Sequence, residues 1–401
     1  MTSRVVLALG VGQLVNWGVL YYAFGVLLVP VERDLGVPRV AVAGAFSLAL
    51  LMSAVAAPLV GRWSDRGLGP LLIRGGGFLA AGLLATWALV PGLTSLYLIW
   101  TGLGLCMAAT LYEPAFAVIG RALHDVHDRL RALAAVTVLG GLASTIFLPL
   151  TAMLTEAWGW RAAVAVLAGV VCLSTALTSL AVLTPVAPAR CAAGHPVPSE
   201  PVNHLLHGDS LQALQDSRGG GTPGLGAVIA VFSMTSLASA AFTTTLVPAF
   251  VDRDFQPTTA AMLGGALGVM QLPGRVLVMN GALATSPVSL LIASLLLQAA
   301  GLTVLAVARS APWATAGVGL FAAGAGLTTI VRPHFVQSVF GMSQAGRLNG
   351  TVARAQQLAR AAAPVLTVGL ATLVGYGTVF AILAALFAVL ALTSRTVLSD
   401  L

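Results

Sequence analysis

Four arginines lie inside apolar stretches of this sequence, where charged side chains are rare. Burying an arginine at the centre of a membrane costs at least ~2.5 kcal/mol, so such a residue normally faces a partner or a cavity. A guanidinium binds a carboxylate through two parallel hydrogen bonds, which makes these arginines candidates for binding an organic anion. The four residues are Arg275, Arg332, Arg354 and Arg360. A purely structural role, such as snorkelling to the surface, is the alternative for each.

Glu113 is the only acidic residue well inside a predicted membrane span. In a low dielectric its pKa would rise, which would make it a candidate proton carrier. An ion pair with Arg332, at the matching depth of the second half, would instead keep it ionised and give it a role in gating or folding. Both interpretations remain open from the sequence.

The composition explains why these charges stand out. Of 401 residues, 58% are hydrophobic and 8% are charged, whereas soluble proteins carry about 25% charged residues. At roughly 20 residues per span, the chain has room for about twelve membrane helices. This excludes a soluble enzyme and a single-span receptor. We predict spans at 5–29, 40–60, 74–90, 96–119, 132–154, 162–184, 225–250, 259–279, 286–307, 312–333, 349–373 and 377–394.

The predicted spans divide into two halves. A polar segment rich in proline and glycine, 185–224, predicts a flexible cytoplasmic linker between a first six-helix bundle, 1–184, and a second, 225–401. The halves resemble each other: Leu-Val-Pro recurs at 28–30 and 246–248, and each copy is followed by an acidic-Arg-Asp triplet. Such a repeat predicts an all-α membrane protein made of two pseudo-symmetric bundles.

The repeat also indicates how deep Arg275 lies. The distance from Asp34 to Arg62 is 28 residues, but the equivalent distance from Asp254 to Arg275 is only 21. At ~1.5 Å per residue, Arg275 lies about 10 Å deeper than Arg62, which is at a membrane surface. Arg275 is therefore the best placed of the four for substrate binding.

The remaining arginines indicate topology. The chain has 20 basic residues, all arginine, and with the N-terminus inside, 11 fall on inner segments and 5 on outer loops. This bias predicts that both termini are cytoplasmic, in the inner membrane of a bacterium. The excess of basic over acidic residues is thus explained by membrane topology, without a nucleic-acid partner.

The connection after span two reads Gly61-Arg62-Trp63-Ser64-Asp65-Arg66-Gly67-Leu68-Gly69. It resembles the signature loop of the major facilitator superfamily, G-x-x-x-D-R-x-G-[RK]-[RK], with one residue inserted and leucines in place of the last basic residues. The resemblance implies that Asp65, Arg62 and Arg66 make gating contacts that break when the two bundles rock.

Within that superfamily, Asn16-Trp17-Gly18, Tyr112-Glu113-Pro114 and Gly274-Arg275 resemble the monocarboxylate porter and oxalate/formate exchanger branch. The branch often has an acid one turn before the span-eight arginine and a lysine in span eleven. Here Gln271 and Gln356 occupy those positions, and Gln271 cannot release a proton. The resemblance also implies a cavity lined by spans one and seven, which adds neutral polar candidates. These are Asn16, Tyr21, Tyr22 and Thr244.

These residues together predict a secondary transporter that moves a small organic anion by alternating access, coupled to a proton or a counter-anion. The alternative is proton-driven efflux of amphipathic drugs through Glu113. A membrane enzyme or a sensor is a weaker alternative, because no catalytic motif is present. We expect no cofactor and no metal site, and we expect the protein to be a monomer in the lipid bilayer.

Overall fold

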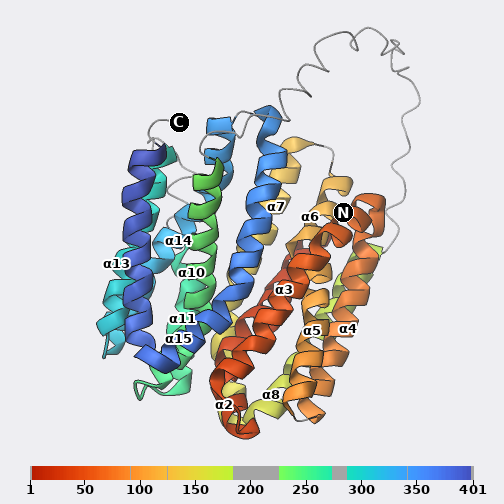
Figure 1. Cartoon of the computed structure of the whole chain (residues 1–401). Helices are drawn as coiled ribbons and strands as arrows, with labels where there is room; N and C mark the ends of the chain where they lie inside the picture. Colours follow the sequence, from red (N-terminus) through yellow and green to blue (C-terminus); the bar gives the residue numbers. More distant parts are fainter. Residues whose placement is uncertain are drawn as a thin grey trace, which may run out of the picture.

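The computed structural model is almost entirely helical in the residues that it describes, which are 2–90, 92–123, 125–183, 225–272, 287–340 and 342–398 (Figure 1). The elements of the first half are α1 (Thr2–Asn16), η1 (Trp17–Tyr22), α2 (Ala23–Leu35), α3 (Arg39–Trp63), η2 (Ser64–Leu68), α4 (Gly69–Leu89), α5 (Leu93–Thr110), α6 (Tyr112–Ala122), α7 (Val126–Gly141) and α8 (Ala143–Leu183). Those of the second half are α10 (Leu225–Val251), α11 (Pro257–Met270), α13 (Pro287–Val307), α14 (Ala311–Phe340) and α15 (Met342–Leu398).

In the part of the chain that the structure describes, seven helical segments are long and apolar enough to cross a membrane. Three of them, of 51, 52 and 43 residues, are too long for one crossing. Each is bent at a glycine with a positive φ, namely Gly67, Gly159 or Gly375, so each forms two spans. Dividing these three and adding α11 and α14 gives the twelve predicted spans. The prediction of an all-α membrane protein with twelve spans is confirmed.

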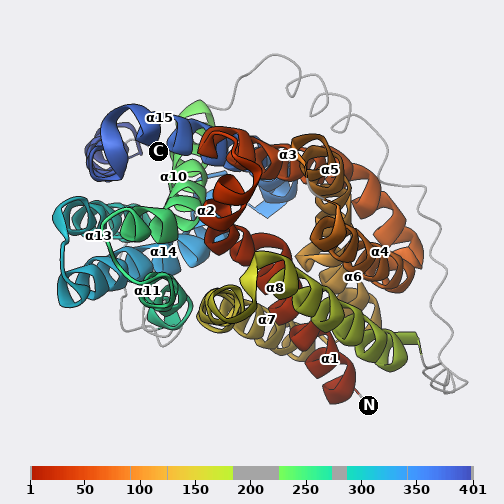
Figure 2. The same cartoon turned by 90° about the horizontal axis from the view of Figure 1, so that it is seen from below.

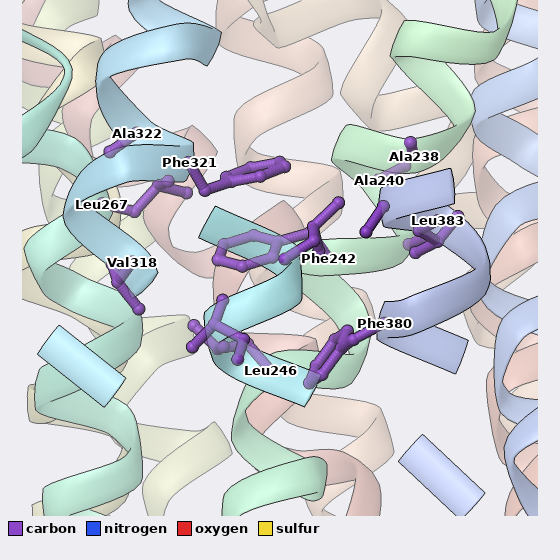
Figure 3. Close-up of a cluster of buried hydrophobic side chains, with 14 of the residues drawn as sticks. Ala238, Ala240, Phe242, Leu246, Leu267, Val318, Phe321, Ala322, Phe380 and Leu383 are labelled. Carbon is purple, nitrogen blue, oxygen red and sulfur yellow. The ribbon is translucent and has the colours of Figure 1, made fainter. Parts of the chain in front are cut away.

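Each half has its own apolar core. The core of the second half is centred on Phe242 of α10 and Phe321 of α14, whose rings stack with centroids 3.9 Å apart (Figure 3). The core of the first half is centred on Phe24, Phe46 and Trp100. Seen from below, the helices of the two halves form separate groups with α2 between them (Figure 2).

The turns between spans five and six and between spans eleven and twelve have the same backbone conformation. Gly159 has φ 78° and ψ 161°, and Gly375 has φ 79° and ψ 155°. A side chain is disfavoured at such angles, which explains glycine at both positions. A proline kink precedes each turn, at Pro149 in α8 and at Pro364 in α15. The repeat is therefore visible in the backbone as well as in the sequence.

Two spans differ from the straight helices expected. Span one contains the π-helical segment η1, and span four breaks at Leu111, whose backbone is extended. The break leaves the Thr110 carbonyl without its helical donor. The amides of Gln13 and Asn16 donate to this oxygen, at 2.8 Å and 3.5 Å. Side chains of span one therefore satisfy the broken backbone of span four, as buried polar groups require.

Candidate functional site

Spans one and seven meet where the two halves face each other. Tyr21 of η1 is buried and its hydroxyl lies against the side chain of Thr243 in α10. One turn further along span one, a Cβ on Gly25 would lie 3.2 Å from the Thr243 carbonyl. The backbones of the two spans are thus in close contact, and the polar groups on them face one another across the interface between the halves.

Arg360 of α15 completes this group. It lies close enough to Tyr21 to act on it electrostatically, and its side chain is half-buried. Within the described part of the chain it has no hydrogen bond and no acidic partner. Pro364 has no N–H, so the Arg360 carbonyl also loses its helical donor. A guanidinium in this position is available to an anion.

The neutral candidates are mostly engaged in holding helices together. The Asn16 amide donates to Thr110, and the buried Thr244 hydroxyl donates to the Ala240 carbonyl at 2.5 Å. Gln356 donates to the carbonyl of Phe232 and to Ser236, at 3.2 Å and 3.0 Å. These bonds tie α15 to α10 within one half. These bonded side chains hold the helices around the site in position. Tyr22 differs from them, because it is half-buried and its ring packs against that of Tyr21.

Several predicted residues are not brought to this place. Arg354 is exposed. Glu113 is the second residue of α6, and its side chain lies at the surface of the protein. It forms no ion pair within the described residues, and its role as a proton carrier or as the partner of Arg332 stays a prediction. Arg275, the linker 185–224 and the side chain of Arg332 lie outside the described residues.

Gln271 caps the C-terminus of α11, where its backbone contacts α14. A Cβ on Gly326 would come within 2.4 Å of the Gln271 carbonyl. The only residue small enough for this approach is glycine. Span eight is therefore in direct contact with span ten at Gln271. This is the position where the resemblance leads us to expect an acidic residue.

An ionic cluster joins the two halves at the end of the molecule opposite the termini, here called the Arg39 end. Arg39 of α3 is bonded to Glu32 at 2.6 Å and to Asp252 at 2.7 Å. It also donates to the Tyr376 hydroxyl, at 3.3 Å. The Arg39 side chain is 15% exposed, so the charge is largely enclosed by its partners. In the sequence, Arg39 is one of the five arginines predicted on outer loops, and nothing there indicates this contact with a residue 213 positions away.

Three further contacts between the halves lie between the Arg39 end and the middle of the spans. The Glu156 carboxylate accepts from the Thr258 backbone at 2.9 Å and from its hydroxyl, and so caps the start of α11. Thr145 donates to the Gly265 carbonyl at 2.7 Å, and the Val365 amide donates to Ser47 at 3.1 Å. Toward the end that holds both termini, α3 and the first half of α15 diverge (Figure 1). The described contacts therefore close the Arg39 end.

The signature loop makes its described contacts within one half. Arg121, at the end of α6, donates to the backbone carbonyl of Asp65 at 2.7 Å. The side chains of Arg62, Asp65 and Arg66 are exposed. Gly67 has φ 90°, and a Cβ there would lie 3.2 Å from the Arg121 guanidinium. Arg121 thus holds the loop in place, a role that nothing in the sequence indicates beyond the positive charge of this residue.

We expect Gly67→Ala to destabilise the protein by about 1–3 kcal/mol, because alanine is strained at this backbone angle and its methyl would press on Arg121. The measurement is thermal unfolding of the purified protein. Gly61→Ala is the matched control, since Gly61 is helical and a Cβ there meets nothing within 4 Å. Equal melting temperatures for the two variants would contradict this role of Gly67.

Comparison with known proteins agrees with this architecture. The model of the Major Facilitator Superfamily matches residues 9–364. The structure is similar to "Crystal structure of nucleoside transporter NupG", with a TM-score of 0.72 and 14% identity over 99% of each chain. It is also similar to the D323A mutant of that transporter, with a TM-score of 0.71 and 13% identity over 98% of this chain and 99% of the other. No curated protein sequence gives a significant match. The family match covers most of the chain, and the chain therefore belongs to the major facilitator superfamily and is a membrane transporter, not an enzyme.

Proposed function

We propose that this transporter moves a small organic anion, a carboxylate, across the bacterial inner membrane by alternating access. The observation that carries the proposal is Arg360, a half-buried guanidinium between the halves with no acidic partner in the described residues. A carboxylate bound there would receive paired hydrogen bonds from Arg360, with the hydroxyls of Tyr21 and Thr243 nearby.

Arg275 and Arg332 are proposed to add positive charge to the same cavity. Both fall inside spans by sequence, in spans eight and ten. Span eight lies against span ten at Gln271, which supports placing the two arginines on neighbouring helices. Arg354, being exposed, is proposed to serve the entrance and not the binding site.

The ionic cluster at Arg39 supports the alternating-access part of the proposal. It closes one end of the interface between bundles 1–184 and 225–401, and an anion would then exchange at the end that holds the termini. With both termini cytoplasmic, this conformation faces inward. Coupling is proposed to be exchange with a second anion or a proton carried by Glu113, which forms no ion pair within the described residues. We propose a monomer, since each protein chain contains both halves of the site.

Drug efflux is the second candidate, and one observation favours it. Trp17 packs against Tyr21 and Tyr112, with ring centroids 5.3 Å and 5.2 Å apart. Aromatic groups beside a substrate site would suit an amphipathic cation or a planar drug.

A ligand screen tests the proposal. We expect small mono- or dicarboxylates to raise the melting temperature of the purified protein, and the same compounds to drive counterflow in sealed vesicles. Nucleosides and amphipathic cations serve as comparison ligands, the former because the similar structure is a nucleoside transporter. Stabilisation and counterflow by cations or nucleosides, with no response to carboxylates, would overturn the anion assignment.

A further inference from the structure

The surface of the second half carries a second group of unpaired positive charges, at the Arg39 end. It is a hollow of about 580 Å³ between the α10–α11 connection, the end of α13 and the turn in α15. We call it the Arg309 hollow. Its lining residues are Arg253, Asp254, Ala306, Val307, Ala308, Arg309, Val374, Gly377 and Thr378.

Arg253 forms the fixed wall of the Arg309 hollow. Its guanidinium donates to the carbonyls of Leu305, Ala308 and Ala306, at 2.8 Å, 3.0 Å and 3.2 Å. These are among the last carbonyls of span nine, which have no helical donors. The guanidinium also lies 5.7 Å from the ring centre of Phe250. The positive charge is therefore held rigidly, and no acidic side chain in the described residues forms an ion pair with it.

Arg309 provides the second charge. It is exposed, and within the described residues it has neither a hydrogen bond nor an ion pair. It lies close enough to Arg253 for the two charges to repel. At the same end of the first half, by contrast, the charge of Arg161 is paired, with Asp34 at 2.7 Å. Asp254 offsets only one of the two charges in the hollow.

Apart from its charged residues and Thr378, the Arg309 hollow is lined by small or apolar residues, several of them exposed on the outer surface of the protein. Val307 is 76% exposed and Val374 is 44% exposed, and next to them Leu373 is 82% exposed. Trp313, at the start of the next span, is 65% exposed. Tryptophans at span ends typically lie at the level of the lipid headgroups. Paired positive charges thus border apolar side chains at the depth where a phosphate group meets acyl chains.

We propose that the Arg309 hollow binds one anionic phospholipid, with its phosphate on Arg309 and Arg253 and an acyl chain along Val307 and Val374. The site is separate from the substrate site at Arg360 and does not depend on the nature of the substrate. The lipid would hold the segments adjoining Asp252 and Tyr376, which are the partners of Arg39 across the interface. Lipid binding and closure of the Arg39 end would thus support each other.

The test measures lipid binding to the purified protein in neutral detergent, by native mass spectrometry and thermal shift. We expect phosphatidylglycerol to bind and stabilise the protein while phosphatidylcholine does not. Arg309→Gln should weaken phosphatidylglycerol binding about fivefold, the amount expected for one arginine near anionic lipid. Because Arg309 has no described partner, this variant should fold normally.

Arg33→Gln is the matched control. Arg33 is exposed in the last turn of α2, at the same end of the molecule but in the first half, and its loss changes the net charge equally. Val307→Ser tests the acyl-chain contact and should weaken lipid binding without changing the charge. Equal losses for Arg309→Gln and Arg33→Gln would overturn the site. Equal stabilisation by glycerol 1-phosphate or inorganic phosphate at the same concentration would overturn the lipid assignment in favour of a free-anion site.

Discussion

Replacing Arg360 with glutamine is expected to reduce transport of the stabilising carboxylate by at least about 30-fold. Removing one partner of an enclosed, hydrogen-bonded charge pair costs roughly 2 kcal/mol or more, and each 1.4 kcal/mol is a factor of ten. Glutamine keeps the length and polarity of the side chain but loses the charge and the paired donors. The measurement is counterflow in vesicles that contain equal amounts of wild-type and variant protein.

Two companion variants make this result specific. Arg360→Lys keeps the charge but loses the bidentate geometry, and should recover part of the activity. Arg354→Gln removes a charge from the same helix, six residues earlier and about 120° away around it. It should have a small effect, since Arg354 is exposed. Full activity of Arg360→Gln, with normal insertion, would remove the central claim. A larger loss for Arg354→Gln would move the binding site to the other arginine.

Arg275→Gln gives a further result for the same site. If Arg275 contributes charge to the cavity as proposed, this variant should also lose carboxylate transport while inserting normally. Measuring it beside Arg360→Gln and the double variant distinguishes a shared site from two independent ones. Strongly non-additive losses are expected when both guanidinium groups bind one substrate.

Replacing Arg39 with glutamine is expected to shift the protein toward the conformation that is open at the Arg39 end. Arg39 bonds to Asp252 and Tyr376 across the interface, so its loss removes contacts that hold the two halves together at this end. Its bond to Glu32 lies within the first half. Asp252 is 42% exposed, so solvent weakens its bond to Arg39. We expect a shift of about 1–2 kcal/mol, or roughly five- to thirtyfold in population.

The shift can be measured as a distance between two spin labels, at Leu89 and Trp313. Both side chains are highly exposed and lie at the Arg39 end, one in each half. Cys106, Cys172 and Cys191 are first replaced. Arg161→Gln is the control, because the Arg161–Asp34 pair has the same 2.7 Å length at the same end but lies within one half. A longer distance in both variants, or in neither, would contradict a gating role for Arg39.

The number of spans could be predicted from the sequence because it depends on local composition. Runs of about 20 apolar residues, bounded by charges or by proline and glycine, indicate spans whatever they later pack against. The break in span four has a local cause, because Pro114 has no N–H to donate to the Thr110 carbonyl four residues earlier. The way this carbonyl is satisfied could not be predicted from local sequence, because the amides of Gln13 and Asn16 reach it from more than 90 residues away.

The candidate site was predicted in part, for the same physical reason. Arginines in apolar segments can be recognised one at a time, and Arg360 was found in this way. The ionic cluster at Arg39 could not be predicted, because Arg39 resembles an ordinary loop residue in the sequence. Its partner Asp252 is 213 positions away. The bonds of Gln356 to α10 and of Thr244 to the carbonyl one turn earlier in its own helix could likewise not be predicted. A polar residue in a span looks the same in the sequence whether it contacts a substrate or a backbone carbonyl.

The contact between the two cores affects how much work is needed to move the halves. Within each core, large rings interlock, as Phe242 and Phe321 do in Figure 3. A single aromatic side chain of the described residues, the partly buried Tyr22, packs against the core of the opposite half. The fully buried residues that reach from one half into the core of the other have no rings. They are Val26, Leu148, Ala152, Ala361 and Val368. Short aliphatic side chains do not interlock deeply, so they can move past one another without large side-chain rearrangements. The two halves can therefore move past each other as rigid bodies. The main resistance to this movement comes from the few polar contacts between them.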